Sequence, residues 1–209
     1  SDEDLIVSPA DGRVMFVVRE RSTGRRPTNE QQKTEQIETH PLMGDWFPQP
    51  LEKPLRFETE QRWSPVDPED ELPTDVIRIA IYMSPLDVHV QRSPINSQIV
   101  AMEHRTGKGL SRGPFRKASK KESEANERVR TVLESDDGLL IEVTQISGAI
   151  ARTIIPFCFV SDYLKRGQRY GMIRLGSRVD IRVPANRVRP LVEPNTMVLA
   201  GSTPLFRRK

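Results

Sequence analysis

A serine, a histidine and an aspartate stand at turns in this chain and could together carry nucleophilic chemistry. The serine is Ser177, which follows Gly176 between two segments of alternating hydrophobicity. A serine hydroxyl held in a strained bend can attack the carbonyl carbon of the residue before it, which converts the amide to an ester. Elimination and hydrolysis would then end one chain at Gly176 and leave a pyruvoyl group on the next. A Gly-Ser pair also occurs in ordinary turns, so a bulge between two strands is the alternative.

His89 and Asp11 are the residues whose surroundings best suit them to assist that serine. His89 lies between two valines, just after a Ser-Pro-Leu-Asp turn that ends an apolar strand. Neither His40 nor His104 has a comparable setting, and loops that follow buried strands often carry functional side chains. Asp11 lies in a Pro-Ala-Asp-Gly turn. Its ordinary role there is turn formation, and its functional role would be to orient a histidine.

The elements that must position these residues are predicted to be strands. Period-2 alternation and β-branched side chains indicate strands at 76–83, 98–103, 128–133, 139–146, 172–175 and 179–183, with further short strands from 188 to 206. A Ser-Asp-Asp-Gly sequence predicts a hairpin turn at 135–138. No helix longer than about two turns is expected. We therefore predict a mainly β (α+β) fold, a single compact domain of antiparallel sheets with barrel-like or sandwich-like packing and few short helices.

Composition limits the class of protein. The chain has 209 residues, of which 36% are hydrophobic and 29% charged, which is typical of one globular domain. A net charge of +3 and the lack of a nucleic-acid-binding motif argue against nucleic acid as a partner. The single cysteine, Cys158, cannot form an internal disulfide, which suits a reducing compartment. Neither a signal peptide nor an apolar run long enough for a transmembrane helix is seen, although an anchor could precede Ser1.

Two segments depart from the regular pattern. Residues 19–75 hold eight of the 17 prolines and are predicted to form an irregular insertion. Its apolar stretch from Leu42 to Phe47 would either pack on the domain or contact a membrane interface. Residues 105–130 are strongly basic and include Lys117. They would form either a solvated loop with a short helix near 119–126 or a surface for phosphate head groups.

Five short motifs, taken in order, resemble the phosphatidylserine decarboxylase family in its short, pyruvoyl-dependent form. Outside residues 19–75 they cover most of the chain. The motifs are Ser-Pro-Ala-Asp-Gly at 8–12, Met-Ser-Pro-Leu-Asp-Val-His-Val at 83–90, Asn-Glu-Arg at 126–128, Ser-Gly-Ala at 147–149, and Gly-Met-Ile-Arg-Leu-Gly-Ser-Arg-Val at 171–179.

The resemblance implies a self-processing enzyme. Cleavage between Gly176 and Ser177 would give a β chain of residues 1–176 and an α chain of residues 177–209, and Ser177 would become the covalent pyruvoyl cofactor. Asp11 and His89 match positions thought to form a triad with the serine, in which the histidine takes the hydroxyl proton and the aspartate orients it. His89, Asn126 and Lys117 are the candidate substrate-binding residues. No metal is implied.

Two features of the sequence bear on this assignment. Longer family members carry a second histidine three positions after the first, where this chain has Arg92. A Leu-Ala-Gly-Ser-Thr sequence at 199–203 resembles the cleavage site of longer members, but a cut there would leave only a short peptide. We therefore favour Ser177 over Ser202.

The implied reaction is decarboxylation of phosphatidylserine to phosphatidylethanolamine and CO2 through a Schiff base with the pyruvoyl group. The protein would then be cytoplasmic and peripheral to the inner face of the cell membrane, with an anionic phospholipid surface and its own cleaved chains as partners. A homo-oligomer is left open. The alternatives are a pyruvoyl decarboxylase of a soluble amino acid, and a pseudoenzyme that binds lipid or serves as a β-sandwich carrier without cleaving.

Overall fold

The described part of the chain consists almost wholly of strands. The computed structural model describes residues 2–21, 37–39, 46–48, 75–105, 127–148, 154–174 and 176–209. Within these ranges the helical structure is one 3-10 turn, η1 (Asp2–Asp4). The main sheet has eight strands in the order β11-β7-β8-β9-β13-β5-β2-β15. Their bounds are β11 Tyr163–Leu164, β7 Ser97–Arg105, β8 Arg128–Glu134, β9 Leu140–Ile146, β13 Ser177–Pro184, β5 Asp75–Met83, β2 Gly12–Arg21 and β15 Met197–Val198.

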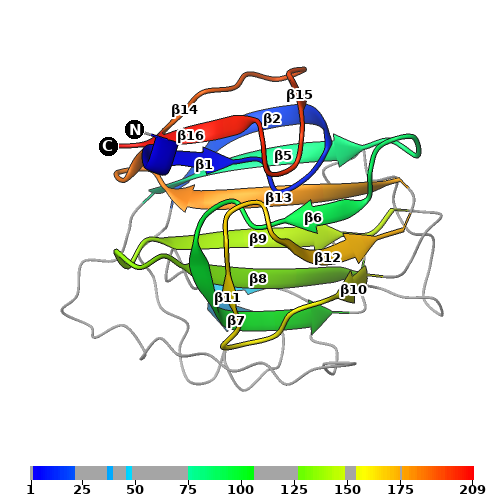
Figure 1. The fold of residues 1–209 in the computed structure, drawn as a ribbon, viewed down its shortest axis with the longest axis horizontal. Helices are drawn as coiled ribbons and strands as arrows, with labels where there is room; N and C mark the ends of the chain where they lie inside the picture. Colours follow the sequence, from blue (N-terminus) through cyan, green and yellow to red (C-terminus); the bar gives the residue numbers. More distant parts are fainter. Residues whose placement is uncertain are drawn as a thin grey trace.

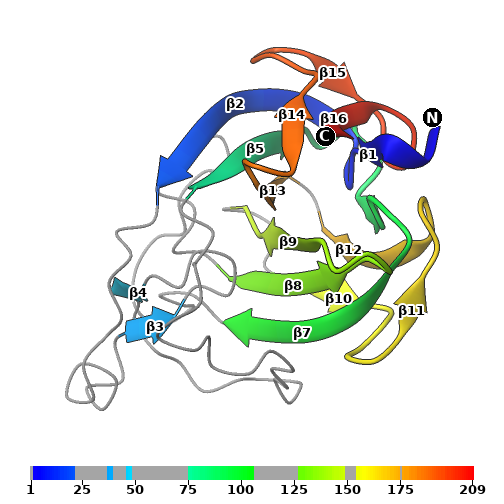
Figure 2. The same ribbon diagram turned by 90° about the vertical axis from the view of Figure 1, so that its left-hand side faces the viewer.

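Two three-stranded sheets lie against one face of this curved main sheet (Figures 1 and 2). One has the order β1-β16-β14 and the other β10-β12-β6. Their bounds are β1 Leu5–Val7, β16 Pro204–Arg208, β14 Val188–Pro190, β10 Ile154–Pro156, β12 Arg169–Ile173 and β6 Val90–Arg92. A separate pair joins β3 (Ile37–Thr39) to β4 (Trp46–Pro48). The strand pairings described are antiparallel.

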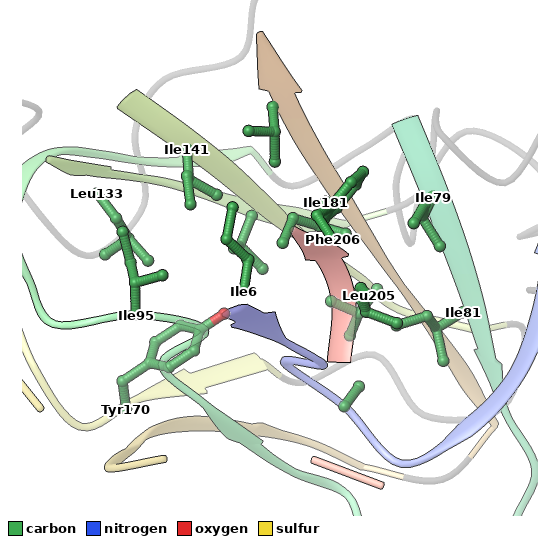
Figure 3. Packing of buried hydrophobic residues seen from close by; sticks show 14 of the residues in the cluster. Ile6, Ile79, Ile81, Ile95, Leu133, Ile141, Tyr170, Ile181, Leu205 and Phe206 are labelled. Atoms are coloured by element: carbon green, nitrogen blue, oxygen red, sulfur yellow. The ribbon is translucent and has the colours of Figure 1, made fainter. Parts of the chain in front are cut away.

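The hydrophobic core fills the space between the main sheet and the smaller sheets. Side chains of a strand alternate between its two faces, so every second residue of β5 and β13 points inward. Ile79 and Ile81 of β5 and Ile181 of β13 are fully buried there. They pack together with Ile6 of β1 and Phe206 of β16 (Figure 3). Burial of this apolar surface is the main stabilising force of the fold.

The opposite face of β13 is also buried, but it carries charges. Asp180 accepts hydrogen bonds from Arg178 Nε at 2.6 Å and from Arg78 Nε at 2.8 Å. Both guanidinium groups lie over the ring of Phe16, at 5.5 and 5.3 Å from its centroid. Burial alone would raise the pKa of Asp180, but the hydrogen bonds and charges of the arginines hold it below the ordinary value. The face is therefore stabilised by paired charges rather than by apolar packing.

The predicted mainly β, antiparallel fold is confirmed. The strand predicted at 76–83 is β5, those predicted at 128–133 and 139–146 form the hairpin β8–β9, and short strands follow residue 188. The division into one domain with an insertion at 19–75 remains a prediction. Much of that insertion, the side chains of the apolar stretch from Leu42 to Phe47, and the helix expected near 119–126 lie outside what the structure describes.

The turn predicted at 11–12 is present, whereas the alternative of a bulge at Gly176 is wrong. The chain bends at 9–11 between β1 and β2, which lie in different sheets because β1 pairs with β16 and β2 pairs with β5. Gly12 has φ +139°, and a Cβ there would lie 2.2 Å from the Tyr82 carbonyl oxygen, so close approach to β5 requires glycine. Gly176 is not a bulge within a ladder. It lies in the connection between β12 and β13, which belong to different sheets.

Candidate active site

Ser177 is the first residue of β13 and is fully buried. It lies opposite Met83, the last residue of β5, so the serine is at the edge of the sheet where β5 ends and β13 begins. Its Oγ lies 3.4 Å from Met83 Sδ and 3.4 Å from His89 Nδ1. The structure thus brings together the serine and the histidine that the sequence placed 88 residues apart.

Gly176 forms a bend in the backbone directly before Ser177. Its φ is +66°, in the left-handed region that favours glycine. A Cβ at this position would meet no atom within 4 Å, so the requirement for glycine comes from the backbone and not from crowding. The chain therefore bends at the residue whose carbonyl carbon the Ser177 hydroxyl would attack.

His89 is held by its backbone behind a tight turn. The turn is closed by Asp87 Oδ2, which accepts a hydrogen bond from Ser84 N at 2.6 Å. The carbonyl oxygen of His89 accepts a hydrogen bond from Ile173 N at 3.0 Å, which ties it to β12. Burial lowers the pKa of His89 below its ordinary value, against the opposing effects of the Ser84 and Pro85 carbonyls and the Asp87 carboxylate.

A lowered pKa keeps the His89 imidazole neutral near pH 7, which is the state that can accept a proton. The 3.4 Å separation from Ser177 is long for a hydrogen bond. Such contacts commonly tighten only when the reaction proceeds. Ser177 and His89 together can act as a nucleophile and its general base.

Asp11 stands apart from this pair in its hydrogen bonding. Its Oδ1 accepts a hydrogen bond from Ala200 N at 2.6 Å. Among the described side chains, no hydrogen bond joins Asp11 to His89, and the carboxylate whose charge acts on His89 is Asp87. The role of Asp11 as the orienting member of a triad stays a prediction. The other two candidates, Lys117 and Asn126, lie outside the described residues.

Arg92 and Ser202, the two residues that bear on the family assignment, both make contacts that support turns. Arg92, where longer members have a histidine, donates from Nη1 to the Gly167 carbonyl oxygen at 2.6 Å and so supports the turn before β12. Ser202 is exposed in a turn in which its backbone N donates to the Leu199 carbonyl oxygen at 3.2 Å. Ser177, and not Ser202, has a histidine at hand among the described residues.

Two buried glutamines lie behind the serine and the histidine. Gln91 of β6 donates from Nε2 to the His89 carbonyl oxygen at 3.2 Å and lies 3.5 Å from Met83 Sδ. Gln145 of β9 donates from Nε2 to Gln91 Oε1 at 2.7 Å. Sequence reasoning missed both, because a glutamine within a strand carries no local signal. Burial of an amide in an apolar run becomes visible only when the sheets are assembled.

Apolar side chains are exposed beside His89. Leu86 and Val88 flank Asp87 on the turn before His89 and are 97% and 61% exposed. Across the adjoining sheet, Val90, Met172 and Ile155 are direct neighbours in register and are half-buried. An apolar surface therefore extends from the turn over the β10-β12-β6 sheet, whose strand β6 begins directly after His89.

Across the described ranges, no helix has the length and hydrophobicity needed to cross a bilayer.

Known proteins resemble the chain along most of its length. A family model described as phosphatidylserine decarboxylase matches residues 1–205. A phosphatidylserine decarboxylase proenzyme of Thermobifida fusca is 42% identical over 138 residues, which are 66% of this chain and 60% of that protein. The proenzymes of Erythrobacter litoralis and Novosphingobium aromaticivorans are 43% and 44% identical over 130 residues, each 62% of this chain and 50% and 49% of the relative.

The chain spans about half to three fifths of the length of these curated relatives. No solved structure matches it significantly. The family model covers nearly the whole sequence, including the turn with His89 and the Gly176–Ser177 bond. The chain therefore belongs to the phosphatidylserine decarboxylase family.

Proposed function

We propose that this chain cleaves itself between Gly176 and Ser177 and that the processed protein decarboxylates phosphatidylserine to phosphatidylethanolamine and CO2. The observation that carries the proposal is the Ser177 Oγ placed 3.4 Å from the Nδ1 of a histidine with lowered pKa, directly after a glycine at φ +66°. The family and the proenzyme names of its relatives support it.

Self-cleavage begins when His89 Nδ1 accepts the proton of the Ser177 hydroxyl. The oxygen then attacks the carbonyl carbon of Gly176, and the peptide bond to the Ser177 nitrogen is replaced by an ester to its Oγ. Loss of the Ser177 α-proton expels the Gly176 carboxylate and leaves dehydroalanine at residue 177. This residue tautomerises to an imine, and water hydrolyses the imine to a pyruvoyl group and ammonia. His89 is the described side chain in range to move these protons.

The surroundings of residue 177 suit such a group. The position is fully buried, with Met83 and His89 around it, so a carbonyl formed there would be enclosed by the protein. A pyruvoyl group supplies a ketone that reacts with an amine and draws electrons away as CO2 leaves. The protein contributes this enclosure and the imidazole of His89, which can hold a proton beside the reacting carbon.

A phospholipid substrate is supported by the exposed apolar side chains beside His89. Leu86 and Val88 are exposed on the turn that carries His89, so acyl chains could pack against them while the head group reaches residue 177. Phe157 and Phe159 are also exposed and offer a further apolar contact for acyl chains, whereas Ile154 of the same segment belongs to the core. Association with the inner face of the cell membrane is part of the same proposal.

Denaturing electrophoresis and intact-mass analysis test the processing step. The purified chain should separate into residues 1–176 and 177–209, and the shorter piece should react with a carbonyl reagent. Ser177→Ala should remain whole. A wild-type chain that stays intact in its native fold would overturn the proposal.

Turnover assays test the substrate. The processed protein should release CO2 from dispersed phosphatidylserine much faster than from free serine. Faster turnover of free serine would favour a decarboxylase of soluble amino acids, and a processed chain inactive on both would refute the decarboxylase assignment.

A further inference from the structure

The β10-β12-β6 sheet lies beside the main sheet (Figure 1), and two buried glutamines make a polar contact between them. Gln91 is 0% exposed and Gln145 is 1% exposed. They come from strands of different sheets, and their amides meet between the sheets at 2.7 Å. Burying two amides costs free energy unless their hydrogen bonds are made, so their placement directly behind Ser177 calls for an explanation.

Gln91 contacts the backbone of the base and the methionine that the nucleophile also contacts. Its Nε2 donates to the His89 carbonyl oxygen at 3.2 Å, which adds a second donor to the one from Ile173 N. The same nitrogen lies 3.5 Å from Met83 Sδ, the atom that the Ser177 hydroxyl also contacts. A single amide group thus joins the backbone of the base to the side chain beneath the nucleophile.

Gln145 determines which way the Gln91 amide points. Because Gln145 Nε2 donates to Gln91 Oε1, the oxygen of Gln91 is held toward β9 and its nitrogen is left to face His89. Gly171 leaves the room for this arrangement. A Cβ at residue 171 would lie 3.0 Å from Gln145 Nε2 and 3.2 Å from the Ile155 carbonyl oxygen. Gln145 on β9 and Gly171 on β12 therefore together fix the orientation of the Gln91 amide on β6.

We propose that Gln91, oriented by Gln145, is a positioning residue that holds His89 at the distance and angle needed to take the proton of Ser177. This inference rests on the proposed self-cleavage and names residues that control its rate. Gln91 takes no part in bond making or breaking. It acts through the His89 carbonyl group, which is bonded to the Cα atom that carries the imidazole side chain.

The first experiment measures the rate of self-cleavage per folded molecule. Gln91→Leu keeps the volume but removes the donor, and a misplaced general base slows such a step by about 10- to 100-fold. Gln145→Leu should give a smaller loss, and the double variant should be no slower than Gln91→Leu alone, because both act through one amide. Ile154→Val, a change in the same inter-sheet space without a polar group, is the matched control and should cleave at the wild-type rate.

The second experiment reads the position of His89 without any cleavage. In the Ser177→Ala background, the His89 imidazole is titrated by NMR with Gln91 present or replaced by leucine. Loosening of the turn should raise the His89 pKa toward its ordinary value, because burial is what lowers it. His104, whose Nε2 pairs with Glu127 Oε1 at 2.9 Å, gives a second imidazole signal that checks whether the fold is unchanged.

The two measurements separate failure of this inference from failure of the proposed function. If wild type cleaves and Gln91→Leu cleaves within twofold of it, Gln91 is only a packing residue. If wild type does not cleave, the proposed function fails, and the His89 titration still decides whether Gln91 positions the histidine. An unchanged His89 pKa in Gln91→Leu would overturn the positioning role.

Discussion

Replacing Asp180 by asparagine should destabilise the protein far more than the same replacement at Asp137. Each aspartate pairs with two arginines. Asp180 binds Arg78 and Arg178 inside the protein, and its side chain is 0% exposed. Asp137 binds Arg187 at 3.2 Å and Arg208 at 3.0 Å on the surface, with its side chain 49% exposed. The pair of variants therefore changes burial while it holds the chemistry of the substitution constant.

The expected magnitudes follow from this difference in burial. Removing one partner from a buried ion pair costs about 3–5 kcal/mol, because the remaining charge stays out of water. A surface pair contributes about 0–1 kcal/mol. For a chain of this size, each kcal/mol changes the melting temperature by about 2–4 °C. Asp180→Asn should therefore melt about 6–20 °C lower than the parent, and Asp137→Asn no more than about 4 °C lower.

Both variants are measured by thermal and urea denaturation in the Ser177→Ala background, where the chain stays whole and unfolding is a one-chain process. The paired arginines keep the pKa of Asp180 below its ordinary value, so the stability that it contributes is present above about pH 4 and is lost as the pH falls through the folded-state pKa. The difference in unfolding free energy between the parent and Asp180→Asn should therefore become smaller in that pH range. A loss of less than 1 kcal/mol for Asp180→Asn at neutral pH would refute the reasoning.

Three further predictions concern single residues near the site. Tyr170→Phe should stabilise the protein by about 1–3 kcal/mol in urea denaturation, because the buried Tyr170 hydroxyl finds no hydrogen-bond partner among the described residues and phenylalanine removes this unsatisfied group; a loss of stability would contradict this. The rate of self-cleavage should be constant near neutral pH and fall as the pH is lowered through a midpoint below about 6.5, because the lowered pKa of His89 keeps it unprotonated until then; a midpoint above that value would exclude His89 as the base. Gly176→Ala in the uncleavable background should cost about 1–2 kcal/mol, since alanine disfavours the φ of +66°, and an unchanged melting temperature would show that the bend relaxes freely.

Local patterns predicted the strands better than their partners. The alternation at 76–83 and 179–183 identified β5 and β13, and Asp-Gly at 137–138 identified the hairpin β8–β9. The turn at 11–12 was also predicted correctly, but it could not reveal that β1 pairs with β16 from the other end of the chain. Turn chemistry is local, whereas pairing between distant segments depends on which apolar faces can be buried together.

The candidate site divides in the same way. Ser177 and His89 could be found because turn residues and neighbouring strands mark them in the sequence. Gln91 and Gln145 could not, because their importance lies in a contact 54 residues apart between two sheets. The carboxylate near His89 is Asp87, whose Ser-Pro-Leu-Asp setting looked like turn formation alone, and it does close that turn.

The place of β13 in the main sheet has a consequence for how the protein could be assembled. This strand is hydrogen-bonded along both edges, to β5 and to β9, and of the later strands β16 pairs with β1 and β15 pairs with β2. A cut before Ser177 would therefore leave residues 177–209 hydrogen-bonded within the sheets of the longer chain. The shorter chain could not dissociate or be exchanged without unfolding of the whole protein. Mixing separately made, already folded halves should fail to reconstitute the protein, so maturation would have to follow folding of the intact precursor.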